Sequence, residues 1–315
     1  MIRRLSADAD LVALAPAWAA LWRARPATPF AHPAWLLPWW RQFGTGWPRV
    51  AVRYDGDRLT GVLPLYEYQG RLLPIGAGPT DYCDVLGDDP APMLAALLDE
   101  MPADLLNAPH GSPLRAVAPP AGWTIAWQDG DACPALPLPA TMDALLAAIP
   151  HTARKLRMNR NRAARAKSVT IRMATADTLG TDLATLISLH QSRWVGQGEV
   201  GVLSDPLVLA FHRDSAPRLL RAGLLRLCVL AVDGAPAAAI YALLSPGRIH
   251  FYLSGFDAAH TAISPGSLLL AAMLEQAIAE GRVEADFLRG QEGYKYAWGA
   301  VDRISAQARI ERNGP

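Results

Sequence analysis

The feature that most constrains the fold is an order of elements that occurs twice along the chain. In the first half, three strand-like runs follow one another, with the hairpin signal Asp55-Gly56 between the first two, at 49–54, 59–66 and 71–75. In the second half, the same order surrounds Asp233-Gly234, with runs at 229–232, 237–244 and 248–254. A helix is expected after the third run in both halves, near Pro92 and near Ser264. The sequence therefore predicts two similar α/β units.

The length supports this division. A chain of 315 residues exceeds one ordinary domain, and 51% hydrophobic residues can supply a core to each half. The proline-rich segment 133–139 lies between the repeats, so we place the boundary there and predict domains at 1–138 and 139–315.

Charge and cysteine content exclude several classes of protein. The net charge is +1, so no overall field favours nucleic acid as a partner. The three cysteines, Cys83, Cys133 and Cys228, are odd in number and far apart, which favours a reducing compartment and no metal cluster. We find no secretion signal and no apolar run of about 20 residues that could span a bilayer. We expect a cytoplasmic protein, or one bound peripherally to the inner face of the membrane.

The densest group of signals lies between residues 262 and 298. Ser264-Pro265-Gly266-Ser267 precedes an apolar periodic run, and Gly281 follows it, which predicts a helix over 264–281. The first amide groups of such a helix suit a phosphate. A short strand is expected over 283–288, interrupted by Asp286.

A polar and aromatic cluster follows that strand. The order Ser264-Pro265-Gly266, about twenty residues, then D-F-x-x-G-x-x-x-Y-K runs through Asp286, Gly290, Tyr294 and Lys295. This pattern resembles the C-terminal half of the GNAT acyltransferase superfamily, in the branch of CelD-like and Fem-type proteins. The superfamily's R/Q-x-x-G-x-G/A phosphate loop does not precede the helix.

The resemblance implies a fold of two tandem GNAT-like domains. Each would be an α/β, α+β layered unit with a mixed, mostly antiparallel sheet flanked by helices. It also implies direct acyl transfer from acyl-CoA to an amine without a covalent intermediate, and no metal. We assign donor binding to the helix mouth and to two basic side chains, at Ser264, Gly266, Ser267, Leu268, Arg154 and Lys155.

Catalysis is assigned to Asp286, which could accept the proton of the amine or pair structurally with Lys295 or Arg289. Tyr294 and Lys295 join it through the motif. On the strand before the Ser264 turn, either Tyr252 or His250 would line the cleft.

Three further groups are assigned by resemblance or composition. The loop Asp81-Tyr82-Cys83-Asp84 resembles the D-Y-x-D turn of the CelD-like branch, which implies site roles for Asp81, Tyr82 and Asp84. The segment His190-x-x-Arg193-Trp194 resembles the same branch, and Arg193, Trp194 and Tyr82 are assigned to substrate binding. Arg289 and the aromatic segment with Trp35 and Trp39 are predicted to contact the acceptor, the aromatic segment alternatively being a helix docked on a core.

A basic helix is predicted at 151–167, rich in Arg and Lys and without an acidic residue. It could be a solvated face, or it could bind an anionic cofactor, an anionic lipid surface or RNA. RNA is the least supported because no aromatic residue is interleaved for stacking.

The function that follows is an acyl-CoA-dependent N-acyltransferase acting on a small-molecule or lipid amine, such as the sphingoid base of a ceramide-synthase-like reaction. Two alternatives stay open: a non-catalytic accessory protein of polysaccharide biosynthesis, and a Fem-type transferase that uses aminoacyl-tRNA.

Overall fold

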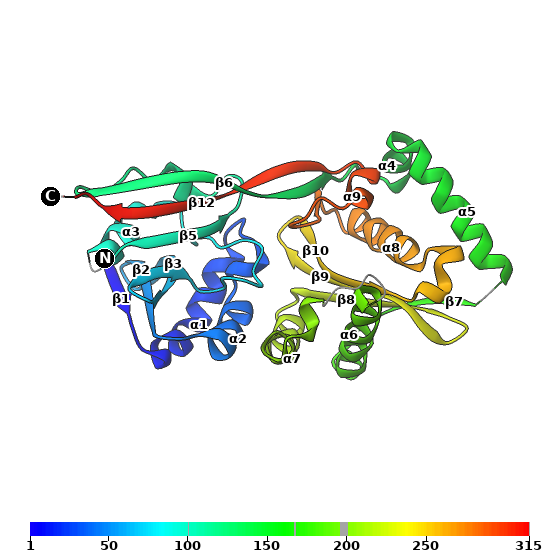
Figure 1. Ribbon diagram of the computed structural model, residues 1–315, viewed down its shortest axis with the longest axis horizontal. Helices are drawn as coiled ribbons and strands as arrows, with labels where there is room; N and C mark the ends of the chain where they lie inside the picture. The colour runs from blue at the N-terminus through cyan, green and yellow to red at the C-terminus, as the bar shows by residue number, and fades with distance from the viewer. Residues whose placement is uncertain (100, 167, 196–200, 315) are drawn as a thin grey trace. The chain divides into compact units, whose positions relative to one another are not determined.

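The computed structural model describes residues 1–99, 101–166, 168–195 and 201–314. The chain divides into two compact units: unit 1 comprises Met1–Ala132 and Arg303–Pro315, and unit 2 comprises Cys133–Asp302. Each is a mixed, mostly antiparallel sheet flanked by helices (Figure 1), as the sequence predicts.

Unit 1 contains the first repeat. Its sheet has the order β1-β2-β3-β4-β5-β12-β6. The strands are β1 (Ile2–Leu5), β2 (Trp47–Asp55), β3 (Arg58–Tyr68), β4 (Arg71–Pro74), β5 (Ala103–Ala108), β6 (Trp123–Pro137) and β12 (Val301–Arg312). The helices are α1 (Asp8–Arg23), α2 (Pro33–Phe43) and α3 (Ala91–Leu98), with short 3-10 turns η1 (Pro29–Ala31) and η2 (Pro113–Ala116). The three strands expected from the first repeat are β2, β3 and β4.

Unit 2 contains the second repeat, with the sheet order β6-β11-β10-β9-β8-β7. Its further strands are β7 (Val169–Met173), β8 (Leu225–Val232), β9 (Ala235–Ser245), β10 (Arg248–Phe256) and β11 (Glu284–Asp286). Its helices are α4 (Met142–Ala148), α5 (Pro150–Ala166), α6 (Leu179–Val195), α7 (Pro206–Arg221), α8 (Pro265–Ala279) and α9 (Gly293–Ala297), with 3-10 turns η3 (Val202–Ser204) and η4 (Ala258–Ile263). The predicted basic and donor helices are therefore α5 and α8.

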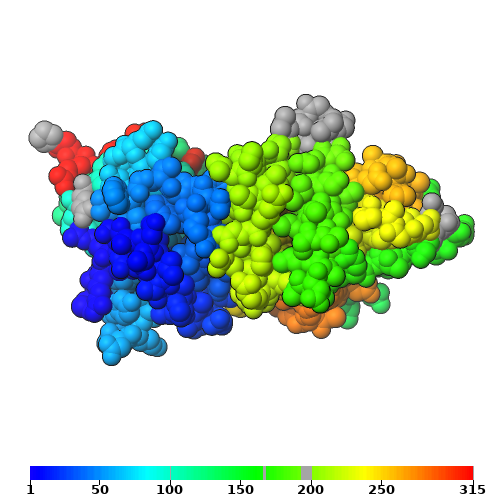
Figure 2. Space-filling model, turned by 90° about the horizontal axis from the view of Figure 1, so that it is seen from below, coloured from blue at the N-terminus to red at the C-terminus, as the bar shows by residue number. Residues whose placement is uncertain are grey.

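Alternation along β9 and β10 sorts the side chains of unit 2 onto two faces. Ala238, Ile240 and Phe251 belong to a core cluster with the apolar side of α8, whereas α6 and α7 cover the other face. Figure 1 shows α8 on one side of this sheet, and Figure 2 shows α6 and α7 adjacent on the other.

The proline-rich segment 133–139, interpreted from sequence as a linker, largely forms the end of β6. It pairs with β11 through Ala135↔Asp286 and Leu136↔Ala285. Proline lacks an amide hydrogen but keeps its carbonyl, and the Pro134 carbonyl accepts from the Phe287 amide at 2.9 Å. A proline can therefore lie in a paired strand when only its carbonyl takes part in the pairing. For this reason the proline content alone wrongly indicates a linker at 133–139.

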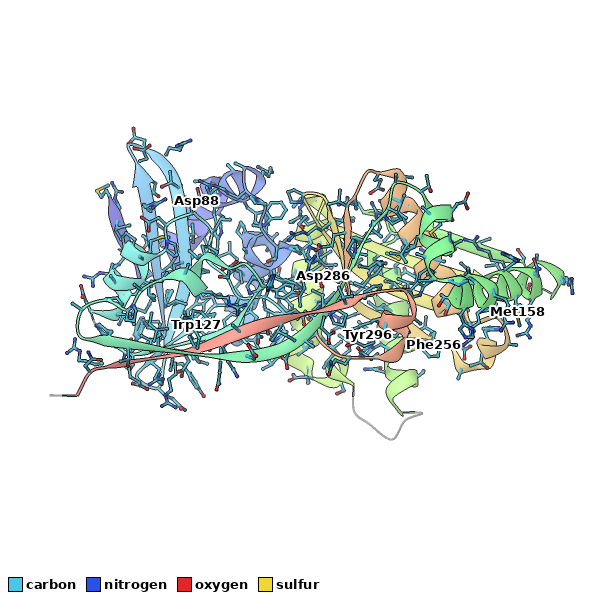
Figure 3. The ribbon with its side chains drawn as sticks, turned by 90° about the horizontal axis from the view of Figure 1, so that it is seen from above. Asp88, Trp127, Met158, Phe256, Asp286 and Tyr296 are labelled. Carbon is cyan, nitrogen blue, oxygen red and sulfur yellow. The ribbon has the colours of Figure 1, made fainter. Side chains whose placement is uncertain are left out.

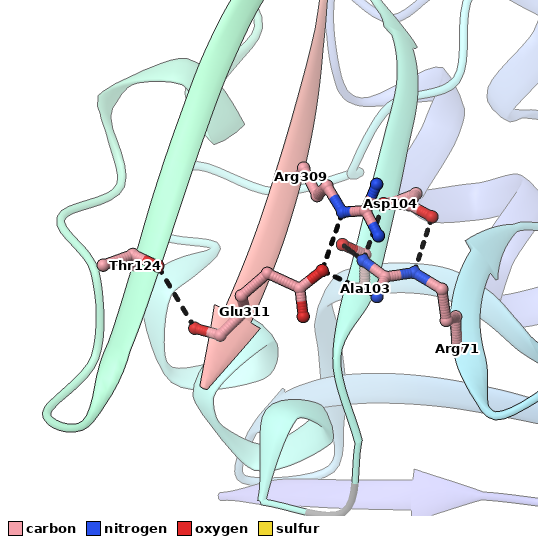
Figure 4. Close-up of polar contacts among 6 residues, drawn as sticks. All are labelled: Arg71, Ala103, Asp104, Thr124, Arg309 and Glu311. Carbon is pink, nitrogen blue, oxygen red and sulfur yellow. Dashed lines mark hydrogen bonds and ion pairs between the residues drawn. The ribbon is translucent and has the colours of Figure 1, made fainter. Parts of the chain in front are cut away.

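The last strand also departs from the sequence-based division, which assigned all of 139–315 to the second domain. Residues 303–315 belong to unit 1, where β12 pairs with β5. Arg71 of β4 bonds Asp104 of β5 at 2.7 Å and Glu311 of β12 at 2.8 Å, and Arg309 also bonds Glu311 (Figure 4). These carboxylates raise the pKa of Arg71, chiefly through the hydrogen bond that Arg71 donates to Asp104. The network ties the end of the chain into the first sheet.

Candidate functional site

The site of unit 2 begins where two parallel strands separate. β10 and β11 pair through only three residues, ending at His250↔Asp286. After Asp286 the chain turns toward β6, while β10 continues to Phe256 with a register shift between Phe251 and Leu253. At ~3.3 Å per residue, the remaining six residues of β10 extend roughly 20 Å past the end of β11. The two strands therefore pair only along this short stretch, and α8 connects them in the chain. We call the region between the end of β11 and the rest of β10 the junction, and its end at Asp286 the narrow end.

The first turn of α8 lies after the far end of β10. Ser264 has φ +50°, and its carbonyl accepts from the amides of Ser267 at 3.0 Å and Leu268 at 3.1 Å. The sequence suggests that the Ser264 hydroxyl caps this helix, but it instead donates to the Thr261 carbonyl at 3.4 Å and makes no cap hydrogen bond. The amides of Ser267 and Leu268, which the sequence analysis assigned to binding the acyl donor, are thus already hydrogen-bonded within this turn. Gly266 is partly exposed and approaches Phe256 closely.

A basic side chain that the sequence analysis did not select lies next to this turn. Arg162 of α5 donates to the Ala262 carbonyl at 3.3 Å, two residues before Ser264. Arg154 and Lys155 are exposed on the same helix, but Arg154 lies two turns earlier, roughly 12 Å along the axis. Helical spacing could have indicated Arg162 only if the docked face of α5 had been known.

Asp286 lies at the narrow end of the junction and is buried, with 4% of its surface exposed. One carboxylate oxygen accepts from the Leu288 amide at 2.8 Å, and the other lies 3.4 Å from Nδ1 of His250. His250 is fully buried, and its Nε2 is 2.9 Å from the Ser245 hydroxyl. Asp286, His250 and Ser245 therefore form a buried polar chain across three strands. Of the two residues considered on β10, His250 is the partner of Asp286.

Lys295 has a structural environment. Its ammonium group is buried and donates to the carbonyls of Leu288, Arg289 and Gly290 at 3.3, 2.7 and 3.0 Å, and it pairs with Glu292 at 2.9 Å. The loop it holds contains two residues with positive φ, Leu288 at +58° and Gly290 at +103°. The spacing of the motif is explained by this loop, which Asp286 fixes at one end and Lys295 at the other.

Two other predicted residues border the same loop. Tyr294 is 43% exposed and contacts the buried Phe287 ring edge-on, with centroids 6.1 Å apart. Phe287 in turn stacks on Phe251 of β10 at 5.3 Å. Arg289 is partly exposed, with its carbonyl bound to Lys295. Figure 3 shows Asp286 and, on α9 beyond this loop, Tyr296.

Tyr252 lies among polar aromatic groups on the face covered by α6 and α7. Its ring is 5.5 Å from His212 of α7 and 5.9 Å from Tyr241 of β9. Burial, with a further contribution from nearby His190, lowers the pKa of His212 to about 3, so this imidazole is neutral at pH 7. Burial also raises the pKa of Tyr241. Tyr252, His212 and Tyr241 thus form a group of three mutually contacting rings beside β10.

The segment His190-x-x-Arg193-Trp194 is explained in part. The His190 Nδ1–H donates to the Ser254 carbonyl of β10 at 3.0 Å. A Cβ on Gly255 would lie 2.4 Å from the His190 amide nitrogen, so only glycine permits α6 to pack this closely on β10. The side chains of Arg193 and Trp194 lie outside the described residues, as does the following glycine-rich loop from 196 to 200.

The predicted residues Asp81, Tyr82 and Asp84 belong to unit 1, in a loop between β4 and α3. The Cys83 amide donates to the Asn107 carbonyl of β5 at 3.1 Å, and Leu86 exchanges two hydrogen bonds with Val62 of β3. This loop thus occupies the space beyond the short strand β4. Asp81 and Tyr82 are buried in it.

Asp84 lines a narrow recess of this loop with Tyr82 and apolar side chains. It accepts from the Ser112 hydroxyl at 2.6 Å and from the Val85 amide at 2.8 Å. Burial raises the pKa of Asp84 to about 7, although both hydrogen bonds lower it.

Trp35 and Trp39 are buried in unit 1, 0% and 2% exposed. Their indole N–H groups donate to the Thr80 hydroxyl at 2.8 Å and to the Ala77 carbonyl at 3.0 Å. The interpretation of this segment as an exposed apolar patch is not supported, because α2 docks on a core and its indoles hold the loop that follows β4.

Comparison with known proteins agrees with this geometry. Residues 150–296, which include α5–α9 and the strand junction, match the family model described as acetyltransferase (GNAT) domain. No match is found among curated protein sequences.

Solved structures resemble the whole chain at low identity. FemX aligns with a TM-score of 0.66 at 11% identity, covering 98% of this chain and 96% of its own. The C-terminal domain of a putative lysylphosphatidylglycerol synthetase from Agrobacterium fabrum gives 0.61 at 11%, covering 98% and 93%. A tandem GNAT protein from the clavulanic acid biosynthesis pathway gives 0.50 at 14%, covering 100% and 99%.

The family match confirms the class predicted from the D-F-x-x-G-x-x-x-Y-K pattern: residues 150–296, which lie in unit 2, form a GNAT acetyltransferase domain, and this supports an acyltransferase. Over nearly its full length, the chain shares the fold of FemX and of the tandem GNAT protein. Within the described residues, no three His, Cys, Asp or Glu side chains gather as metal ligands would. None of the helices in the described part of the chain has the length and apolar character needed to cross a bilayer.

Proposed function

We propose that the protein transfers an acyl group from a CoA thioester to the amine of an amphiphilic acceptor. The observation that carries the proposal is the separation of β10 from β11 beyond His250, which leads from Asp286 to the first turn of α8. An extended chain that contains amides can add to such a strand edge by main-chain hydrogen bonds. The pantetheine arm of CoA has this chemistry.

The phosphates of the donor would then lie at the other end of the junction. The partly exposed amide of Gly266 and the positive end of the α8 dipole favour an anion there. The Arg162 guanidinium, next to Ala262, adds a charged donor that can bind a phosphate oxygen. This arrangement takes over the role that a glycine-rich loop before the helix would otherwise have.

In the reaction, the acceptor amine attacks the thioester carbonyl, the C–N bond forms, and the C–S bond breaks. The amine must first lose a proton, and Asp286 is the buried carboxylate at the narrow end of the junction. His250, 3.4 Å from its second oxygen, shares the proton that Asp286 accepts. As the C–S bond breaks, the nitrogen gives up its second proton through solvent, and the leaving thiolate takes up a proton to become the thiol of CoA.

The acceptor is proposed to be a lipid amine, such as a sphingoid base, delivered in the cytoplasm at the inner face of the membrane. The whole-chain likeness to a lysylphosphatidylglycerol synthetase domain, whose name refers to a phospholipid, supports this class of acceptor. The likeness to FemX supports a second candidate, in which aminoacyl-tRNA is the donor.

Thermal unfolding of the full chain with CoA, long-chain acyl-CoA or aminoacyl-tRNA separates the candidates. A donor present at 100 times its Kd stabilises the protein by about 2.7 kcal/mol. We expect this shift with acyl-CoA and none with tRNA. A shift with aminoacyl-tRNA alone would support the second candidate. Absence of any shift would favour a non-catalytic accessory protein and overturn the proposal.

A further inference from the structure

The basic side chains of α5 are divided by the way this helix docks. Leu156 and Ala163 are buried in the core of unit 2, and the Thr152 hydroxyl donates to the Ala297 carbonyl at 2.6 Å. On the flanks of this docked side, Arg160 pairs with Glu275 of α8 at 3.3 Å, and Arg162 bonds the Ala262 carbonyl. These contacts fix which side of α5 faces the body of unit 2.

The opposite side of α5 presents a stripe of basic residues. Arg154, Arg157, Met158 and Arg165 are all exposed, and their spacings of three, four and eleven residues place them on one side of a helix. Met158 is 44% exposed on this side and is marked on α5 in Figure 3. We call these four residues the α5 stripe. No acidic residue occurs anywhere in α5, so the stripe carries three positive charges without a compensating charge on its own helix.

We propose that the α5 stripe binds the anionic headgroups of a phospholipid bilayer, with Met158 entering the interface between the arginines. Charge complementarity argues for an anionic partner, and an exposed methionine among arginines suits a surface that offers both headgroups and acyl chains. A helix that lies flat on a bilayer uses one side along its length, and the stripe covers about 17 Å from Arg154 to Arg165 at ~1.5 Å per residue. RNA would need stacking partners, and the stripe contains no aromatic side chain.

This surface deepens the proposed function by naming where a lipid acceptor is met, but it does not depend on the acyl-transfer reaction. The stripe faces away from the contacts that hold α5 on α8 and η4. Vesicle binding can therefore be measured without acyl-CoA, and acyl-CoA binding can be measured without vesicles. Failure of one proposal is then distinguishable from failure of the other.

The test is co-sedimentation of the full chain with phosphatidylcholine vesicles, with and without 30% phosphatidylglycerol. The triple variant R154Q/R157Q/R165Q is compared with R58Q/R213Q/R221Q, which removes three exposed arginines elsewhere for the same change in net charge.

Since each basic residue near an anionic surface contributes about fivefold to the binding constant, the stripe variant should bind the anionic vesicles on the order of 100-fold more weakly. The control variant should stay within about twofold of the wild type. Met158→Ser should lose about threefold, and 0.5 M salt should weaken the wild type as the stripe variant does.

Equal binding to both vesicle types, no binding to either, or equal loss in the two triple variants would overturn the proposal. Binding of tRNA that the stripe variant loses, in place of vesicle binding, would overturn it in favour of RNA. Far-ultraviolet circular dichroism and the thermal shift with acyl-CoA show that each variant remains folded.

Discussion

In unit 1 the space beyond the end of β4 is filled by the chain itself, whereas in unit 2 β10 continues past the end of its pairing with β11. Both units join a parallel strand pair through a helix, α3 in one and α8 in the other. In unit 1, Cys83 bonds Asn107 of β5 and Leu86 bonds Val62 of β3. In unit 2, β10 and β11 stop pairing at Asp286.

The comparison indicates a division of labour between two copies of one architecture. A strand edge already hydrogen-bonded to its own loop cannot accept an extended ligand without breaking those bonds. Unit 1 uses its junction for hydrogen bonds within the chain, and we propose that unit 2 uses its junction to bind a donor. The helices that connect the parallel strands also differ. Helix α3 has 8 residues, whereas α8 has 15 residues and begins at a Ser-Pro-Gly turn.

The largest expected effect is the difference in kcat between variants of the two buried aspartates, Asp286 in unit 2 and Asp84 in unit 1. Asp286→Asn should lower kcat by about 10²- to 10⁴-fold, the usual contribution of a general base, with little change in acyl-CoA affinity. Asp84→Asn, the matched change in unit 1, should leave kcat within about threefold. Steady-state kinetics and acyl-CoA titration measure both. Equal losses in the two variants would remove the distinction between the junctions.

The loop after β11 gives the next largest effect. Lys295→Met keeps the length of the side chain but leaves the carbonyls of Leu288, Arg289 and Gly290 without their donor. Loss of these bonds in a buried loop should cost about 3 kcal/mol in the free energy of unfolding. Urea unfolding followed by fluorescence measures this cost. A variant as stable as the wild type would show that the ammonium group does not hold the loop.

Two glycines, one in each unit, allow a neighbouring segment to pack closely. Replacing each of them tests which unit holds the donor. Gly255→Ala places a Cβ 2.4 Å from the His190 amide nitrogen, and Gly87→Ala places one 2.8 Å from the Thr60 carbonyl oxygen in unit 1. Each should destabilise by about 2 kcal/mol. Only Gly255→Ala should also weaken acyl-CoA binding, by about tenfold, because α6 is displaced from β10. If Gly87→Ala weakens binding equally, unit 1 takes part in holding the donor.

The smallest effect is the pH dependence contributed by Asp84. Burial raises the pKa of Asp84 from its ordinary value of 3.8 to about 7 in the folded protein, so the folded state binds more protons between these values. The free energy of unfolding should therefore fall as pH rises from about 5 to 7, by about 2 kcal/mol relative to Asp84→Asn. Unfolding curves of both proteins at pH 5 and pH 8 measure this difference. Parallel changes in the two proteins would place the carboxylate in water.

The sequence predicts the repeat, the helices α5 and α8, and the family through short-range patterns. It does not reveal β5, β6 or β12, because their pairing partners lie far along the chain and their periodicity is weak. The partners of Asp286 illustrate the same limit. Leu288 is two residues away, but His250 is brought to Asp286 only by the register of two parallel strands.

Arg162 shows why side-chain orientation could not be read from composition. All the basic residues of α5 look equivalent in the sequence, and only the burial of Leu156 and Ala163 assigns Arg162 to the turn before α8 and Arg154 to the outer side. Trp35 and Trp39 show the converse, since aromatic residues that suggest a binding surface are needed to fill the core of unit 1.

Hydrogen–deuterium exchange with and without long-chain acyl-CoA tests the central claim most directly. If the donor lies in the open junction, it should slow exchange at 251–256 of β10 and at 264–268 by at least tenfold, and leave 76–86 of unit 1 unchanged. Protection confined to 76–86, or no protection in β10 at a saturating concentration, would contradict the account.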